Sequence, residues 1–243
     1  MKRFILLATA LLCTSISSNA IVMRHDLKPQ QYEVKSAQYP SVVNLDFLTG
    51  TLIHPQWILT AAHGTDYMPG KQALTIKGQQ YTVQFIVSHP QYNERNLSHD
   101  MALLKLDRPV TDVTPTGIYT KTDETNQHVW FVGYGDVGNG KVGITGGSSV
   151  LNHAENIIEE TSKLWLKFDF DAPDNNALQL EGISGPGDSG GPALVNTPTG
   201  YKVAGVSSHQ RNNEQGEGLY NVEEYYTRTS AHQLWIDATI QQS

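Results

Sequence analysis

The chain has 243 residues, 17 of them basic and 24 acidic, and a formal net charge of −7. This length accommodates one large domain or two compact halves with an ample core. An acidic chain without a basic cluster argues against nucleic acid and anionic membranes as partners. Charged residues make up only 17% of the chain and 21 residues are glycine, a composition typical of an all-β secreted protein.

Residues 1–20 have the pattern of a secretory signal peptide. Lys2 and Arg3 form a positive end, residues 4–13 form an apolar run too short to span a bilayer, and Ser18-Asn19-Ala20 is a small-x-small cleavage site. We therefore predict a secreted or periplasmic protein with no stable membrane anchor after cleavage. A buried N-terminal helix is the alternative.

Short apolar runs follow along the chain, separated by turn residues, and predict β-strands. The polar segment 111–125 is the expected link between two halves, and the glycine-rich segment 137–149 is an expected mobile loop. Short strands at this regular spacing predict paired β-barrels. The predicted strands cover residues 42–48, 50–53, 57–60, 74–76, 81–87, 101–106, 129–135, 164–170, 193–195, 201–208 and 225–228.

A single helix is expected at the end of the chain. Ser230 is the predicted N-cap of a helix over residues 231–240, with Leu234, Trp235 and Ala238 on one face. The sequence therefore predicts an all-β fold that ends in one α-helix.

The stretch Gly185-Pro186-Gly187-Asp188-Ser189-Gly190-Gly191-Pro192 is the densest in glycine around a hydroxyl and an acid. Glycines on both sides allow positive φ and a tight fold that holds the Ser189 hydroxyl out of the surface. The N–H groups of Gly187 and Ser189 are then candidates to meet at one point, as an oxyanion hole requires. A plain turn between two strands is the alternative.

Two further segments supply the groups that a serine nucleophile needs. His63 follows the apolar run 57–60, and Asp100 precedes the apolar run 101–106. Serine is nearly inert without an adjacent base, and histidine takes and returns a proton near neutral pH. An aspartate on the other imidazole nitrogen fixes the tautomer. The chain order His63, Asp100, Ser189 is the order found in chymotrypsin.

The stretches T-A-A-H, H-D-M-A-L-L-K-L and G-D-S-G-G-P resemble those of the chymotrypsin-like (trypsin-like) serine proteases. The resemblance runs from Ile21 to the last helix. It implies two six-stranded antiparallel β-barrels with the active site in the cleft between them. The N-terminal barrel is expected over about residues 21–118, the C-terminal barrel over about 126–229 and the closing helix over about 231–240.

The resemblance also has departures. Cys13 is the only cysteine, so the mature chain has none, and Leu48, Gly64 and Gly185 stand where the family commonly has cysteines. These departures indicate a bacterial-type member without disulfides.

The resemblance gives Asp188 a separate role, since in the family this acid pairs with the α-ammonium of the first mature residue. Here that residue is Ile21, because the predicted cleavage after Ala20 lies directly before Ile21-Val22. We therefore hypothesise that export itself activates the protein. Met23-Arg24 replace the glycines usual at this point. A solvated loop aspartate is the alternative.

The walls of the expected substrate pocket contain Ile183, Ser184, Ser208 and Gln210. Trypsin-like members have an acid where this chain has Ile183, so Arg and Lys at P1 are not expected. Ser208 matches the serine that supports the aspartate. Gln210 stands where glycine often leaves the pocket open, which favours small or medium apolar P1 residues unless its side chain swings out to solvent.

The sequence thus predicts a serine endopeptidase that acts on proteins or peptides as a monomer. No metal-ligand spacing is present, so neither a metal nor another cofactor is expected. Two alternatives remain open: an inactive homologue that binds peptides or a surface partner, and an esterase that uses the same acyl chemistry.

Overall fold

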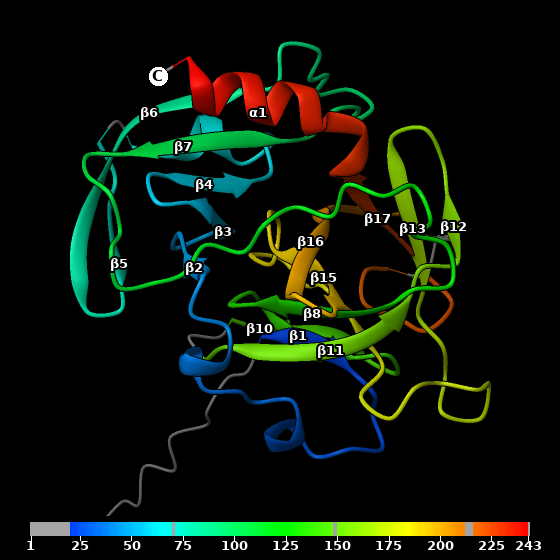
Figure 1. The fold of residues 1–243 in the computed structure, drawn as a ribbon. Coiled ribbons are helices and arrows are strands. Elements are labelled where there is room, and N and C mark those ends of the chain that lie inside the picture. Colours follow the sequence, from blue (N-terminus) through cyan, green and yellow to red (C-terminus); the bar gives the residue numbers. More distant parts are fainter. Residues whose placement is uncertain (1–19, 70, 148–149, 212–215, 243) are drawn as a thin grey trace, which may run out of the picture.

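The computed structural model describes residues 20–69, 71–147, 150–211 and 216–242 (Figure 1). Apart from Ala20, the predicted signal peptide lies outside the described residues. Over the described ranges most of the regular secondary structure is β-strand, and the chain ends in a single α-helix. The predicted all-β fold with a C-terminal helix is therefore confirmed.

The first half of the chain forms a six-stranded antiparallel sheet in the order β2-β3-β4-β7-β6-β5. Strand β5 alternates exposed Ala73 and Thr75 with buried Leu74 and Ile76, whereas β4 is buried throughout. The inward side chains form a core that includes Leu52, Ile58 and Leu104. The strands are β2 Val42–Asn44, β3 Thr49–His54, β4 Trp57–Thr60, β5 Ala73–Ile76, β6 Gln79–Ser88 and β7 Ala102–Leu106.

The second half contains a seven-stranded antiparallel sheet in the order β11-β8-β15-β16-β17-β13-β12. Phe131, Phe168 and Tyr226 pack in its core, with ring centroids 4.6–5.1 Å apart. The two-residue strand β12 only extends one edge. The strands are β8 His128–Gly133, β11 Asn152–Ile157, β12 Glu160–Thr161, β13 Trp165–Asp169, β15 Pro192–Thr197, β16 Gly200–Arg211 and β17 Glu223–Arg228.

A smaller sheet with the order β10-β9-β1-β14 lies beside the second half. Its strands are β1 Ile21–Met23, β9 Val137–Asn139, β10 Gly143–Gly146 and β14 Gly182–Ile183. Strand β1 pairs with β9 and β14, and its side chains Ile21 and Met23 pack in the core of the second half. The first barrel was expected to begin at Ile21, whereas its sheet begins at Val42.

The segment 137–149 differs from the expected mobile loop. Over its described part, β9 and β10 form an antiparallel hairpin that is buttressed by β1. Gly143 has a φ of 76°, which a residue without a side chain adopts at little cost, so the glycines here form a turn rather than a loose segment.

The end of the chain begins as a 3₁₀ turn, Ser230–His232, and continues as α1, Gln233–Gln241. The N-cap of α1 is His232, not Ser230, whose hydroxyl instead donates to Glu124. Leu234 is 87% exposed, so the predicted apolar face is wrong. Ile236 is the buried residue of α1, and it packs on a core shared by both halves. The other 3₁₀ helices are Pro29–Gln31, Ser36–Gln38 and Thr65–Tyr67.

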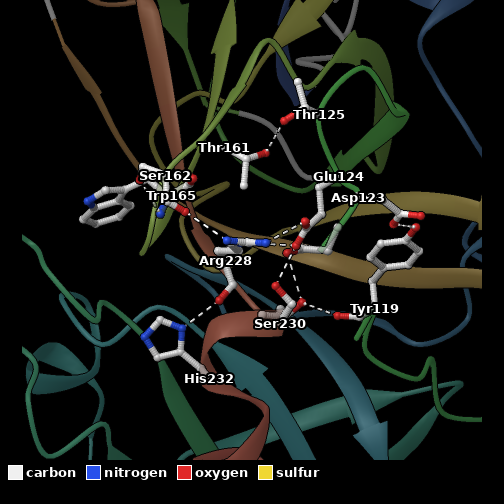
Figure 2. Close-up of polar contacts among 12 residues, drawn as sticks. Tyr119, Asp123, Glu124, Thr125, Thr161, Ser162, Trp165, Arg228, Ser230 and His232 are labelled. Atoms are coloured by element: carbon white, nitrogen blue, oxygen red, sulfur yellow. Dashed lines mark hydrogen bonds and ion pairs between the residues drawn. The ribbon is translucent and has the colours of Figure 1, made fainter. Parts of the chain in front are cut away.

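A buried ion pair fastens the link between the halves to β17 (Figure 2). Arg228 donates from Nε and Nη2 to the two carboxylate oxygens of Glu124 at 2.7 and 2.8 Å, and Ser230 donates to the same carboxylate. Glu124 is fully buried. Burial raises its pKa, but the hydrogen bonds from Arg228 and Ser230 outweigh burial, and the net pKa is lowered. The pair therefore holds Glu124 ionised inside the protein.

Replacing one partner should leave the other charge buried and unpaired. We expect Arg228→Met to lower the free energy of unfolding by about 3–5 kcal/mol, with partial recovery in the double variant Arg228→Met/Glu124→Gln. Denaturant unfolding measures both. The matched control is Lys77→Met, since the Lys77–Asp112 pair is exposed, and its change should stay within about 1 kcal/mol. Equal losses in the two single variants would contradict the buried-pair interpretation.

Candidate active site

Neighbouring strands bring His63 and Asp100 together. Thr60, at the end of β4, pairs with Ala102, at the start of β7. His63 lies three residues beyond the first position and Asp100 two residues before the second, so both leave the same end of the sheet. Ser189 comes from the second half, in the loop before β15, and its carbonyl accepts a hydrogen bond from the N–H of Thr49 in the first half at 2.9 Å.

The three predicted residues form an unbroken line of short contacts. His63 Nε2 lies 2.9 Å from Ser189 Oγ, and His63 Nδ1 lies 2.7 Å from Asp100 Oδ2. A carboxylate only accepts hydrogen bonds, so Nδ1 carries the imidazole proton and Nε2 presents a lone pair to the serine hydroxyl. The structure therefore places Ser189 in reach of a base whose tautomer is fixed.

Asp100 is fully buried, yet its carboxylate has several donors. Besides the imidazole, Oδ1 accepts from the backbone N–H of His63 at 2.8 Å, and Oδ2 accepts from the Ser208 hydroxyl at 2.6 Å. The Asp100 carbonyl accepts from the Thr227 hydroxyl at 2.9 Å. Hydrogen bonds to the ionised form offset the cost of burying this charge. Ser208 thus lies where the sequence predicts, against the aspartate.

The loop around Ser189 is shaped by two glycines with positive φ, 90° at Gly187 and 85° at Gly190. A side chain on Gly190 would collide with the Thr60 hydroxyl and the Thr49 carbonyl, so only glycine fits. The two halves of the molecule meet closely at this point.

Two backbone hydrogen bonds orient the Pro186–Gly187 and Asp188–Ser189 peptide groups. The Pro186 carbonyl accepts from the N–H of Asp136 at 2.5 Å, and the Asp188 carbonyl accepts from the N–H of Gly191 at 2.7 Å. Because a trans peptide points its N–H away from its C=O, these bonds also fix the N–H groups of Gly187 and Ser189. Neither N–H donates to another residue in the described part of the chain.

Asp188 is 2% exposed and lies beneath this loop. Its carboxylate accepts from the N–H groups of Gly135 and Gly185 at 2.7 and 2.9 Å, and the backbone N–H of Ile21 lies close enough to favour its ionised form. Burial raises the pKa of Asp188 to about 7, although these backbone hydrogen bonds act in the opposite direction. In the uncleaved chain the nitrogen of Ile21 is an amide, so this carboxylate has no positive partner there.

A cavity of about 350 Å³ opens beside Ser189 and His63. Ser184, Ser208 and Gln210 line it, as predicted. Gln210 does not swing out to solvent: its Nε2 donates to the Ser184 carbonyl at 2.6 Å, and its Oε1 accepts from the N–H of Gly218 at 3.0 Å. The glutamine therefore bridges the cavity and narrows it.

Ile183 is a correction to the predicted pocket. It is fully buried in β14, pairs with Val22 and packs against Phe170 and Val222, and it is not among the cavity-lining residues. The sequence reasoning counted positions back from the serine, which does not tell on which side of the strand a side chain lies.

Glu224, in β17, is a buried titratable residue that the sequence reasoning missed. It is fully buried behind the cavity wall, where both the N–H and the hydroxyl of Ser184 donate to its carboxyl. Burial raises its pKa to about 8, so the carboxyl is mostly protonated at pH 7. The period-two alternation of β17, in which Glu224 and Tyr226 share the inner face, is the signal that places it there.

Comparison with known proteins relates this site to a family. A sequence model of the family described as Trypsin matches residues 29–236. Chymotrypsin-like elastase family member 1 from Macaca fascicularis is 30% identical over 235 aligned residues, covering 83% of this chain and 85% of that protein. Human Kallikrein-4 is 26% identical over 257 aligned residues, covering 99% of this chain and 95% of that protein. The residues matched by the family model include His63, Asp100 and Ser189.

The raised pKa of Glu224 predicts a pH dependence of stability. In the folded state this group keeps a proton that the unfolded chain releases, so wild-type stability falls as pH rises from about 4.5 toward about 8. Glutamine carries no such proton. The difference in unfolding free energy, Glu224→Gln minus wild type, should therefore increase from pH 5 to pH 9, as measured by denaturant titration.

Glu223→Gln is the matched control. The hydrogen bond from Tyr225 and contacts with Lys167 lower the pKa of Glu223, so its stability contribution is lost only in acid, as pH falls through that lowered value. Its difference from wild type should stay level from pH 6 to pH 9. A level profile for Glu224→Gln as well would contradict the burial argument.

Proposed function

The chain belongs to the trypsin family of serine proteases, and from that premise we propose that it is a secreted or periplasmic serine endopeptidase acting through an acyl-enzyme on Ser189. The observation that carries the proposal is the line of contacts from Ser189 Oγ through His63 to Asp100, at 2.9 and 2.7 Å. Its proposed substrates are proteins or peptides. The family resemblance inferred from the sequence motifs is confirmed.

His63 moves one proton in each half of the proposed reaction. As Ser189 Oγ attacks the peptide carbonyl carbon, His63 Nε2 takes the hydroxyl proton. It then gives that proton to the departing amine as the C–N bond breaks, leaving an ester on Ser189. A water molecule repeats the sequence and frees the acid. Asp100 holds Nδ1–H and offsets the imidazolium charge, so the ring neither turns nor changes tautomer.

The N–H groups of Gly187 and Ser189 are the proposed oxyanion hole. Both peptides are held by hydrogen bonds on their carbonyl side, so the donors are in place before the oxyanion develops. A preorganised donor pair needs no rearrangement during the reaction, which is why such a pair lowers the barrier.

Cleavage after Ala20 is the proposed activating step. Ile21 has a φ of 75°, a conformation that strongly disfavours a β-branched residue. That dihedral exists only while residue 20 is attached, so cleavage removes the strain. Cleavage also turns the Ile21 nitrogen, already near the Asp188 carboxylate, into an ammonium that pairs with it. The ion pair then stabilises the loop that carries Gly187 and Ser189.

The cavity supports a preference for small or medium apolar P1 residues. Gln210 spans the cavity and narrows it. The carboxyl of Glu224 is buried, accepts a hydrogen bond from the Ser184 hydroxyl and is mostly protonated at pH 7. A P1 cation would enter without a fixed counter-charge deep in the cavity, which is costly. Glu217 also lines the cavity, but it is exposed to solvent and so is not a counter-charge deep in the cavity.

Removing the nucleophile tests the reaction. Ser189→Ala should remain folded and lose peptidase activity by several orders of magnitude, because only the attacking oxygen is removed. A fluorophosphonate should label wild type and not this variant. Ser36→Ala, at an exposed serine, is the matched control and should keep both properties. Unlabelled wild type would favour a binding module, and labelling with turnover of esters alone would favour an esterase.

A peptide library tests the proposed preference. We expect kcat/KM to be highest for small or medium apolar P1 residues and low for Arg and Lys. Gln210→Gly should widen the cavity and raise the ratio of kcat/KM for P1 Phe over P1 Ala. A wild-type preference for P1 Lys or Arg would contradict the argument and would indicate that Glu224 is ionised when substrate binds.

A further inference from the structure

Three histidines that the proposed reaction does not use gather in one cluster. His89 follows β6, His99 directly precedes Asp100, and His232 is the N-cap of α1. Each offers one ring nitrogen, and these nitrogens lie within 4.8 Å of one another. The residues are far apart in sequence, and the fold alone brings them together.

We propose that His89, His99 and His232 bind a divalent transition-metal ion, with Zn²⁺ as the best fit. Imidazole nitrogen is a common ligand for Zn²⁺, with Zn–N distances of about 2.0–2.1 Å. Three nitrogens around one tetrahedral ion then lie about 3.4 Å apart. His99 Nδ1 and His232 Nε2 are already 3.0 Å apart. The three nitrogens lie within 4.8 Å of one another, so the widest of their separations must shorten when the ion binds.

His232 has the hydrogen bonding expected of a metal ligand. Its Nδ1 lies 2.7 Å from the Arg228 carbonyl and donates to it (Figure 2). Nε2 therefore presents a lone pair, and it lies 3.0 Å from His99 Nδ1. A second hydrogen bond of this kind fixes the tautomer and orientation of metal-bound histidines. The Arg228–Glu124 ion pair holds Arg228 in turn, so the ligand is positioned by a buried network.

His99 supplies the adjustable ligand. In the metal-free protein its Nδ1 donates to His232, and on metal binding that proton moves to Nε2, with no net gain or loss. His99 is only partly buried, so its ring can rotate toward the other two and an ion has a path from solvent. His89 and His232, 7% and 3% exposed, form the fixed wall of the site.

The three histidines supply three of the four ligands of a tetrahedral ion. The fourth position of a tetrahedral ion is left to water.

A bound ion would join elements that are far apart in the chain. His89 and His99 belong to the first half, and His232 begins the closing helix. The ion would therefore tie the start of α1 to the first half, next in the chain to Asp100. The expected consequence is a higher unfolding temperature with Zn²⁺ bound. Metal binding here does not depend on the proposed peptidase activity.

Metal titration of the full chain carrying Ser189→Ala tests the site, the substitution preventing self-digestion. Zn²⁺ is measured by competition with a chromophoric chelator, and Co²⁺ by its visible absorption, which reports ligand type and geometry. We expect one ion per chain and a raised unfolding temperature. His99→Asn should weaken Zn²⁺ binding by more than about tenfold, since a direct ligand matters at least as much as an outer partner. Asparagine tolerates the φ of 55° at this position.

His25→Asn is the matched control, since His25 is exposed and outside the cluster, and its binding should equal that of the parent. If His99→Asn fails to fold, as judged by circular dichroism, His89→Gln replaces it with the same expectation. Binding of Zn²⁺ that is unchanged in His99→Asn and His89→Gln would overturn the proposal, because the ion would then lie elsewhere, at His63 for example. Absence of stoichiometric binding in the parent would overturn it as well.

Discussion

The buried carboxylate of Asp188 holds three separate segments of the second half together. It accepts hydrogen bonds from Gly135 after β8 and from Gly185 after β14, and the N–H of Ile21 in β1 lies close enough to favour its ionised form. Its own backbone lies between the N–H groups proposed to receive the oxyanion. A carboxylate in this position without a positive partner is costly, as its raised pKa of about 7 reflects. The geometry of the Ser189 loop therefore depends on what the Ile21 nitrogen becomes.

The reacting groups are divided between the halves. His63 and Asp100 come from adjacent strands of the first sheet, whereas Ser189 and Ser208 come from the second. The halves must keep a fixed relation for contacts near 3 Å to persist. A core shared by both, in which Ile236 of α1 takes part, and the Glu124–Arg228 pair both supply that constraint.

Much of the fold was predictable because its signals are local. Short apolar runs marked most strands, including β4 over the predicted residues, and each of the motifs around His63, Asp100 and Ser189 is a short stretch of neighbouring residues. The structure brings those three side chains together. What the sequence could not indicate was non-local. Strand β1 pairs with strands of the second half, and its three apolar residues alone do not indicate which strands they pair with.

Side-chain direction accounts for the errors at the pocket and the helix. Counting back from Ser189 reached Ile183 but did not reveal that it faces the core. Glu224 is adjacent to another glutamate in sequence and differs from it only in facing inward. Leu234 is apolar yet exposed, because Ile236 and its neighbours already cover the surface beneath α1. The histidine cluster escaped notice because His99 and His232 are 133 residues apart.

The dependence of the site on the Ile21–Asp188 contact is tested most directly by one added residue. Chains that begin at Ile21 and at an extra Met before it are compared in kcat/KM and in the rate of fluorophosphonate labelling. The account predicts a loss of about 10²-fold or more on addition, comparable to removing an oxyanion-hole donor. In an Asp188→Asn background the added residue should make little further difference. Equal activity of the two chains with Asp188 intact would contradict the account.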